Sequence, residues 1–155
     1  MNKIPSRDIF RGKCFQPRFE KRRHRERTEK AMTLQELYAS FGENCDQALR
    51  VLRMEKLVDK HIRRLPANGV IDSLLAAGET MDPARLFETA HAAKGNCANL
   101  GLMKLSAAAS EIAEEFRPGN PRTMTDEEVK EKLQAIAVMY EQTVNAIRRY
   151  EAENP

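Results

Sequence analysis

Apolar residues recur at helical spacing through most of this chain. The clearest pattern spans residues 83–100, where they follow one another at intervals of four, three, four and three: Leu86, Ala90, Ala93, Cys97 and Leu100. A seam of this kind predicts an amphipathic helix with one face packed against a core. Asp82 is a typical N-cap, Pro83 suits the first helical position, and Gly101 predicts the end of the helix.

The same spacing predicts two further helices downstream. The first presents one apolar face made of Leu102, Leu105, Ala109, Ile112 and Phe116. The second presents a longer one made of Val129, Leu133, Ile136, Tyr140, Val144 and Ile147. Thr125 and Glu128 form a capping box at the start of this second helix, and the polar run 117–124 predicts a long loop before it.

Two short helices are predicted where the helical patterning begins. Thr33 and Glu36 form a capping box for the first of them, and Gly42 should end it. Its inward positions are Leu34, Leu37 and Tyr38. The inward positions of the second short segment are Cys45, Ala48, Leu49 and Leu52.

Two more helical patterns lie between these segments and residue 83. The first spans residues 54–65, and Pro66 should end or bend it; its inward positions are Leu57, Val58 and Ile62. Gly78 should close the second, whose inward positions are Val70, Ile71, Leu74 and Leu75. Long helices joined by short turns predict an all-α fold. We expect an antiparallel four-helix bundle, with the short N-terminal helices capping one end.

Charge divides the chain into two parts. Residues 1–30 carry eleven Lys and Arg against four Asp and Glu, a net charge of +7, whereas the rest carries −4 and the whole chain +3. Because residues 1–31 lack apolar periodicity, we expect a largely disordered basic tail before a helical domain of residues 32–155. Met32 is an alternative start of the protein. A weak hint of nucleic-acid binding comes from three aromatic residues among the cations: Phe10, Phe15 and Phe19.

Length and composition fit one small domain outside the membrane. At 155 residues the chain suits a single core. It contains no run of about 18 or more apolar residues, and it begins with no apolar segment of a secretory signal. Neither paired cysteines nor metalloprotease-like histidine spacing occurs, so we expect no metal site. Its cysteines are odd in number and scattered, which predicts reduced thiols in the cytoplasm: Cys14, Cys45 and Cys97.

His91 is the main candidate for chemistry. At 100° per residue it lies about 140° from the centre of the seam of helix 83–100, so it should face outward. Lys94 and Gly95 are its +3 and +4 neighbours and share its face. A glycine inside a helix costs roughly 1 kcal/mol relative to alanine, so close approach of a partner would explain Gly95.

An exposed imidazole beside a cation and a bare glycine suits a histidine that carries a phosphoryl group. The spacing alone leaves open an ordinary solvent-facing histidine on a bundle helix. Phe87 and Ala98 also share the face of His91, and they could offer a partner a small apolar landing area.

The stretch 87–116 resembles the histidine-containing phosphotransfer (HPt) family, and it reads FETAHAAKGNCANLGLMKLSAAASEIAEEF. The resemblance extends loosely over residues 33–150. At position 93 the family often has a larger aliphatic residue, but Ala93 belongs to the buried seam, so we expect altered packing and unaltered chemistry. The residues that carry the resemblance are Ala90, His91, Lys94, Gly95, Gly101, Leu105 and the acidic residues Glu111, Glu114 and Glu115.

The resemblance implies that His91 is the phosphorylated residue and that Lys94 and Gly95 support it. It implies a phosphorelay intermediate, which accepts a phosphoryl group from a receiver-domain aspartate and passes it to another receiver. The partners would be receiver domains of response regulators or of hybrid histidine kinases. The receiver would bring Mg²⁺, since we expect the chain to bind no cofactor of its own. We expect a monomeric carrier and no ATP-dependent kinase, because no nucleotide-binding motif is present.

Two other classes of function stay open. A non-phosphorylated helical module could bind a receiver or another signalling partner, although such a module has no need of His91, Lys94 and Gly95 together. A nucleic-acid-associated protein could act through residues 1–30, and steep salt dependence of binding that is lost without this segment would identify it.

The remaining reactive side chains give weaker signals. His61 is interpreted as a histidine at the edge of the core, and His24 lies in the basic tail without partners. Cys97 belongs to the buried seam, where a thiol is a poor nucleophile. The Glu114-Glu115 pair is interpreted as charge on a helix face.

Overall fold

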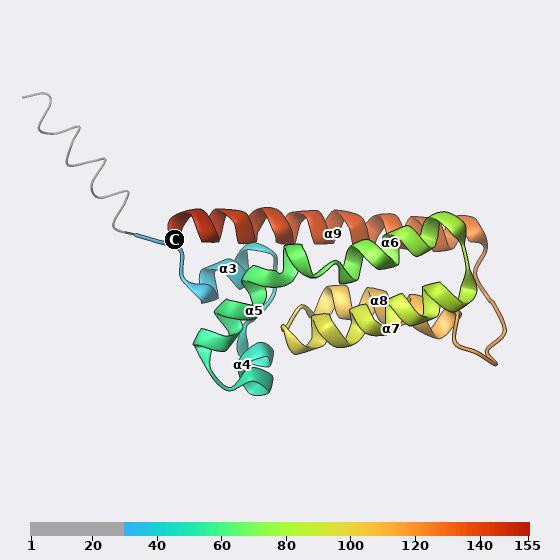
Figure 1. Ribbon diagram of the computed structural model, residues 1–155, viewed down its shortest axis with the longest axis horizontal. Coiled ribbons are helices and arrows are strands. Elements are labelled where there is room, and N and C mark those ends of the chain that lie inside the picture. The colour runs from blue at the N-terminus through green and yellow to red at the C-terminus, as the bar shows by residue number, and fades with distance from the viewer. Residues whose placement is uncertain (1–29) are drawn as a thin grey trace, which may run out of the picture. The chain divides into compact units, whose positions relative to one another are not determined.

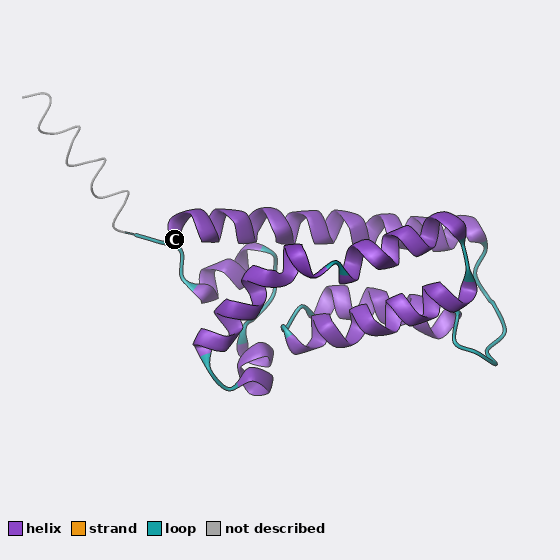
Figure 2. Cartoon of the chain, viewed as in Figure 1, coloured by secondary structure: helices purple, strands orange, loops and turns teal. Residues whose placement is uncertain are grey.

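The computed structural model describes residues 30–155, and in this part of the chain every regular element is an α-helix. Residues Thr33–Pro155 form one compact unit. The expected basic tail, residues 1–31, lies almost entirely outside the described residues, as do Cys14 and His24. The helices are α3 (Leu34–Ser40), α4 (Asp46–Leu52), α5 (Glu55–Asn68), α6 (Val70–Thr80), α7 (Pro83–Asn99), α8 (Met103–Glu115) and α9 (Asp126–Glu153) (Figures 1 and 2).

Helices α6 to α9 form the predicted antiparallel four-helix bundle. Each of them packs against two others, α6 on α7 and α9, and α8 on α7 and α9 (Figure 1). Every residue of the three seams predicted for α7, α8 and α9 is buried. The all-α prediction is therefore confirmed, because the 3.6-residue period places each apolar stripe on the inner side of its helix.

Helices α3 and α4 cover the end of the bundle where α7 turns into α8. The phenol of Tyr38 in α3 donates a 2.6 Å hydrogen bond to the carbonyl oxygen of Leu100. A Cβ on Gly101 would lie 3.1 Å from the backbone nitrogen of Ala48 in α4, so this turn packs closely on α4. The predicted capping role of the short helices is confirmed, and the capping box of Thr33 and Glu36 is present.

The predicted ends of α5 and α6 were wrong. Helix α5 continues through Pro66 to Asn68 and is capped by Gly69, whose φ of 70° is left-handed. Proline gives up its own backbone hydrogen bond and its ring crowds the carbonyl four residues earlier, but only two helical residues follow Pro66, so little of the helix lies beyond the disturbed turn. Gly78 does not close α6 but lies buried inside it, and a Cβ there would overlap the side chain of Leu133 in α9. Gly78 therefore allows α6 and α9 to pack closely.

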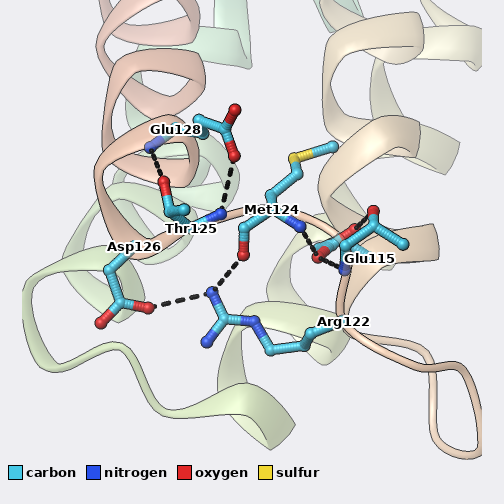
Figure 3. Close-up of polar contacts among 7 residues, drawn as sticks. Glu115, Arg122, Met124, Thr125, Asp126 and Glu128 are labelled. Carbon is cyan, nitrogen blue, oxygen red and sulfur yellow. Dashed lines mark hydrogen bonds and ion pairs between the residues drawn. The ribbon is translucent and has the colours of Figure 1, made fainter.

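Glu115 anchors the loop between α8 and α9 (Figure 3). Its side chain is only 6% exposed, so the interpretation as a charge on a helix face was wrong. One carboxylate oxygen accepts hydrogen bonds from the backbone nitrogens of Thr123 and Met124, both at 2.7 Å, and the other accepts one from the Thr123 hydroxyl at 2.8 Å. Arg122 donates to the carbonyl of Met124 at 3.2 Å and to Asp126 at 2.9 Å.

We expect Glu115→Gln to flatten the acid dependence of stability. The hydrogen bond from the Met124 backbone is the main cause that lowers the pKa of Glu115, although desolvation opposes it. Because the folded pKa lies below the unfolded one, this stabilisation is complete above the ordinary pKa of 4.5 and is lost as the pH falls through the folded pKa. Urea unfolding at pH values from about 6 to 3 should therefore show a smaller loss of stability in the variant than in the wild type.

Glu141→Gln provides the matched control, because Glu141 is exposed on α9. This variant should follow the wild-type pH dependence. An acid dependence of Glu115→Gln that matches the wild type would contradict the anchoring role of the ionised carboxylate.

Candidate functional site

The candidate site lies on the outer face of α7. This helix has the predicted bounds, with the Asp82 side chain accepting a 3.2 Å hydrogen bond from the Ala84 backbone and Pro83 at its start. Ala90 and Ala93 are fully buried against the rest of the bundle, which fixes the rotation of α7 about its axis. His91 is consequently exposed, as its angle from the seam predicted.

Lys94 and Gly95 lie one turn further along the same face as His91. The Lys94 side chain is half-buried, and its backbone carbonyl accepts a 3.0 Å hydrogen bond from the Ser106 hydroxyl of α8. Gly95 is exposed, and a Cβ built on it would meet no atom within 4 Å. The surface beside His91 is thus bare where Gly95 lies and positively charged where Lys94 lies.

Phe87 and Ala98 extend this face in both directions along α7. Both are half-buried, so each combines a packed side with an accessible one. The ring of Phe87 stacks on the imidazole of His91, with centroids 5.8 Å apart and planes inclined by 28°. This stacking limits the directions that the imidazole can adopt, and it leaves an apolar strip beside the histidine.

The C-terminal end of α8 brings two charged residues to this face that the sequence pattern did not assign to the site. Glu114 and Arg117 form a two-pronged ion pair, with nitrogen-to-oxygen distances of 3.0 and 2.5 Å. The Arg117 guanidinium carbon lies 5.9 Å from the centroid of the Phe87 ring. The pKa of Glu114 is lowered chiefly by its hydrogen bond from Arg117, with smaller electrostatic contributions from Lys94 and His91.

A simple sequence signal could have found this pair. Helices α7 and α8 are antiparallel and joined by the tight turn at Gly101. Residues at similar separations from such a turn lie opposite one another, and Glu114 lies 13 residues after Gly101 while Phe87, one turn from His91, lies 14 residues before it. The interpretation of Glu114 as an exposed charge on its helix is confirmed, and α8 presents this charge on the side of the bundle that carries His91.

The other reactive side chains are separate from this face. His61 is exposed on α5, so its interpretation as a core-edge residue was wrong: Val58, Ile62 and Leu65 make the buried face there. Cys97 is fully buried, and burial raises the pKa of its thiol to about 12.

Within residues 30–155, no cluster of three or more His, Cys, Asp and Glu side chains is arranged to hold a metal ion. None of the helices in this range is both long and apolar enough to cross a bilayer.

Comparison with protein families identifies residues 31–146 as an Hpt domain. Comparisons with curated proteins and with solved structures found no match. Hpt domains act in histidine phosphotransfer within phosphorelays and generally interact with receiver domains. The matched range contains all of α3 to α8 and most of α9, and therefore the whole face around His91. The chain belongs to the Hpt domain family, as its resemblance in sequence implied.

Proposed function

We propose that this protein is a phosphorelay intermediate that carries a phosphoryl group on His91. The observation that carries the proposal is the exposed imidazole on α7 of an Hpt bundle, with Lys94 and the bare surface of Gly95 one turn away. The phosphoryl group comes from the aspartate of one receiver domain and leaves to the aspartate of another. Phe87 and Ala98 form the apolar part of the docking surface for these receivers.

The proposed transfer exchanges one bond to phosphorus for another. The lone pair of an imidazole nitrogen of His91 attacks the phosphorus of the receiver's aspartyl phosphate and forms an N–P bond. The P–O bond to the aspartate breaks, and the carboxylate leaves with the bonding electron pair. The imidazole, still protonated on its other nitrogen, then releases that proton to solvent. The reverse sequence passes the phosphoryl group to the next aspartate.

The residues around His91 have distinct parts in this proposal. Lys94 offsets the negative charge of the phosphoryl oxygens. Gly95 leaves room for the receiver backbone to approach the imidazole. The receiver contributes the aspartate and the Mg²⁺ that receiver chemistry requires, and cytoplasmic receivers are the expected partners.

The proposal is tested by incubating the full chain with a panel of phosphorylated receiver domains. We expect label that is labile in acid and stable in alkali, which is the behaviour of a phosphoramidate, and peptide mapping should place it on His91. Binding of a receiver without any transfer of label would instead favour the helical interaction module. Label on a carboxylate or hydroxyl residue would contradict the proposal.

We expect Lys94→Ala to slow phosphoryl transfer roughly tenfold, because a half-buried ammonium contributes about 1.5 kcal/mol to a charged hydrogen bond. The phosphohistidine should also hydrolyse faster. Single-turnover transfer from a phosphorylated receiver measures the first effect. Lys130→Ala is the matched control, since Lys130 is an exposed lysine in the groove between α6 and α9. Equal rates for the two variants would remove Lys94 from the site.

We expect substitutions of Gly95 to move stability and transfer in opposite directions. Gly95→Ala should raise the free energy of unfolding by as much as about 1 kcal/mol, because the open helical site gains propensity without a clash. Gly95→Gln should also fold normally. Both should slow transfer from a receiver, and the longer side chain should slow it more.

Ala135→Gln controls for added bulk on an exposed helix, since Ala135 is exposed on α9, away from the face of α7 that carries His91. Transfer rates and urea midpoints are measured for all three variants. A wild-type transfer rate in Gly95→Gln would place the docking surface elsewhere around His91.

A further inference from the structure

The ion pair at the end of α8 lies beside the candidate phosphorylation site. Arg117, Phe87 and His91 form a row, in which the guanidinium carbon lies 5.9 Å from the Phe87 centroid and that ring lies 5.8 Å from the imidazole centroid. Lys94 lies one turn beyond His91 on the other side. Cations therefore flank the imidazole in both directions along α7.

In the unphosphorylated protein, Glu114 occupies the guanidinium fork of Arg117. Both of its carboxylate oxygens accept hydrogen bonds from Arg117, at 3.0 and 2.5 Å. A guanidinium fork fits a carboxylate and a phosphoryl group with the same planar, two-pronged geometry. Arg117 and Glu114 side chains are 44% and 49% exposed, so the pair can open toward solvent without breaking the core.

Phosphorylation of His91 changes the charge that this pair experiences. A phosphoryl group carries about −1.5 to −2 charges near pH 7. Glu114 is already within electrostatic reach of both His91 and Lys94, so the new negative charge repels its carboxylate and attracts the guanidinium. For this exchange the exposed Arg117 side chain moves from the Phe87 ring toward the imidazole.

On the basis of the proposed function, we infer that Arg117 is a second phosphoryl-binding cation and that Glu114 holds it until His91 is phosphorylated. The N–H groups of Arg117 then donate to phosphoryl oxygens in place of the Glu114 carboxylate. Arg117 stabilises the phosphohistidine. Glu114 destabilises it, because its carboxylate repels the phosphoryl group and competes with it for the guanidinium of Arg117. The two partners of one ion pair therefore have opposite effects on the lifetime of the phosphorylated state.

The test measures hydrolysis of phosphohistidine in the full chain after labelling with phosphoramidate, a small donor that needs no receiver. Arg117→Ala should shorten the half-life about two- to fivefold, as expected for one exposed charge pair, and Glu114→Gln should lengthen it by a similar factor. Arg117→Lys should lie between Arg117→Ala and the wild type, because it keeps the charge but loses the fork. A pair with only a structural role would shift both half-lives in the same direction.

Glu111→Gln and Lys132→Ala are matched controls, since they break the other exposed ion pair of α8, whose atoms are 2.6 Å apart and bridge to α9. Neither should change the half-life. A direct readout is the NMR resonance of the Arg117 Nε–H group. Its chemical shift should change when the wild type is phosphorylated, and it should not change when the His91→Gln variant is incubated with phosphoramidate.

The outcomes separate this inference from the proposed function. Unchanged half-lives in Arg117→Ala and Glu114→Gln, or an Arg117 resonance that does not respond to phosphorylation, overturn the inference while the relay function stands. Receivers that fail to label His91 overturn the relay function. In that case phosphoramidate still labels the imidazole and the half-lives still decide the role of Arg117.

Discussion

Replacement of His91 by glutamine is expected to abolish phosphoryl transfer from a phosphorylated receiver and to leave the fold intact. Glutamine is polar and similar in length, but its amide nitrogen has no lone pair free to attack phosphorus. His91 is exposed, so the free energy of unfolding should change by no more than about 0.5 kcal/mol. Radiolabel from the receiver and a urea unfolding curve measure the two effects on the same preparation.

His61→Gln is the control for this experiment. His61 is also an exposed helical histidine, but it lies on α5 and outside the face that carries Lys94 and Gly95. This variant should accept label at the wild-type level. Label that persists in His91→Gln would show that the assignment is wrong, and His61 and His24 would then be tested in turn.

Gly101→Ala is expected to lower the free energy of unfolding by about 2–4 kcal/mol, a larger loss than any substitution on the His91 face should cause. Two costs add at this turn between α7 and α8. The φ of Gly101 is +73°, a conformation that strains any residue with a Cβ. The new Cβ would also lie 3.1 Å from the Ala48 backbone nitrogen and 3.4 Å from the Asn44 carbonyl oxygen, and backbone atoms cannot easily move away.

Gly119→Ala separates these two costs. Gly119 has a φ of +92°, but a Cβ there would meet nothing within 4 Å. Gly119→Ala should therefore lower the free energy of unfolding only through backbone strain, by about 1–2 kcal/mol. Urea midpoints give both values, and the difference between them measures how closely α4 packs on the turn. Equal losses in the two variants would show that α4 adapts to the added methyl group.

Elements whose signals are local could be predicted from the amino-acid sequence alone. The ends of α7, the capping boxes at Thr33 and Thr125 and the inward faces of α7 to α9 agree with the structure. Caps act through hydrogen bonds within one turn, and an apolar stripe depends only on the 3.6-residue period. The exposure of His91 beside Gly95 followed from the same period, because the seam of α7 sets which side of the helix faces water.

Features that depend on atoms from another helix could not be predicted in this way and emerge from the packing of the helices. Gly78 is indistinguishable in sequence from a helix terminator, and only the side chain of Leu133 across the α6–α9 interface shows why it lies inside a helix. Glu115 looks like surface charge until the Thr123 and Met124 amides fold back onto it. Arg117 comes over the Phe87 ring, one turn from His91, through the pairing of α7 with α8. Local patterns fix the faces of helices, whereas the partners of each face depend on how separate helices pack.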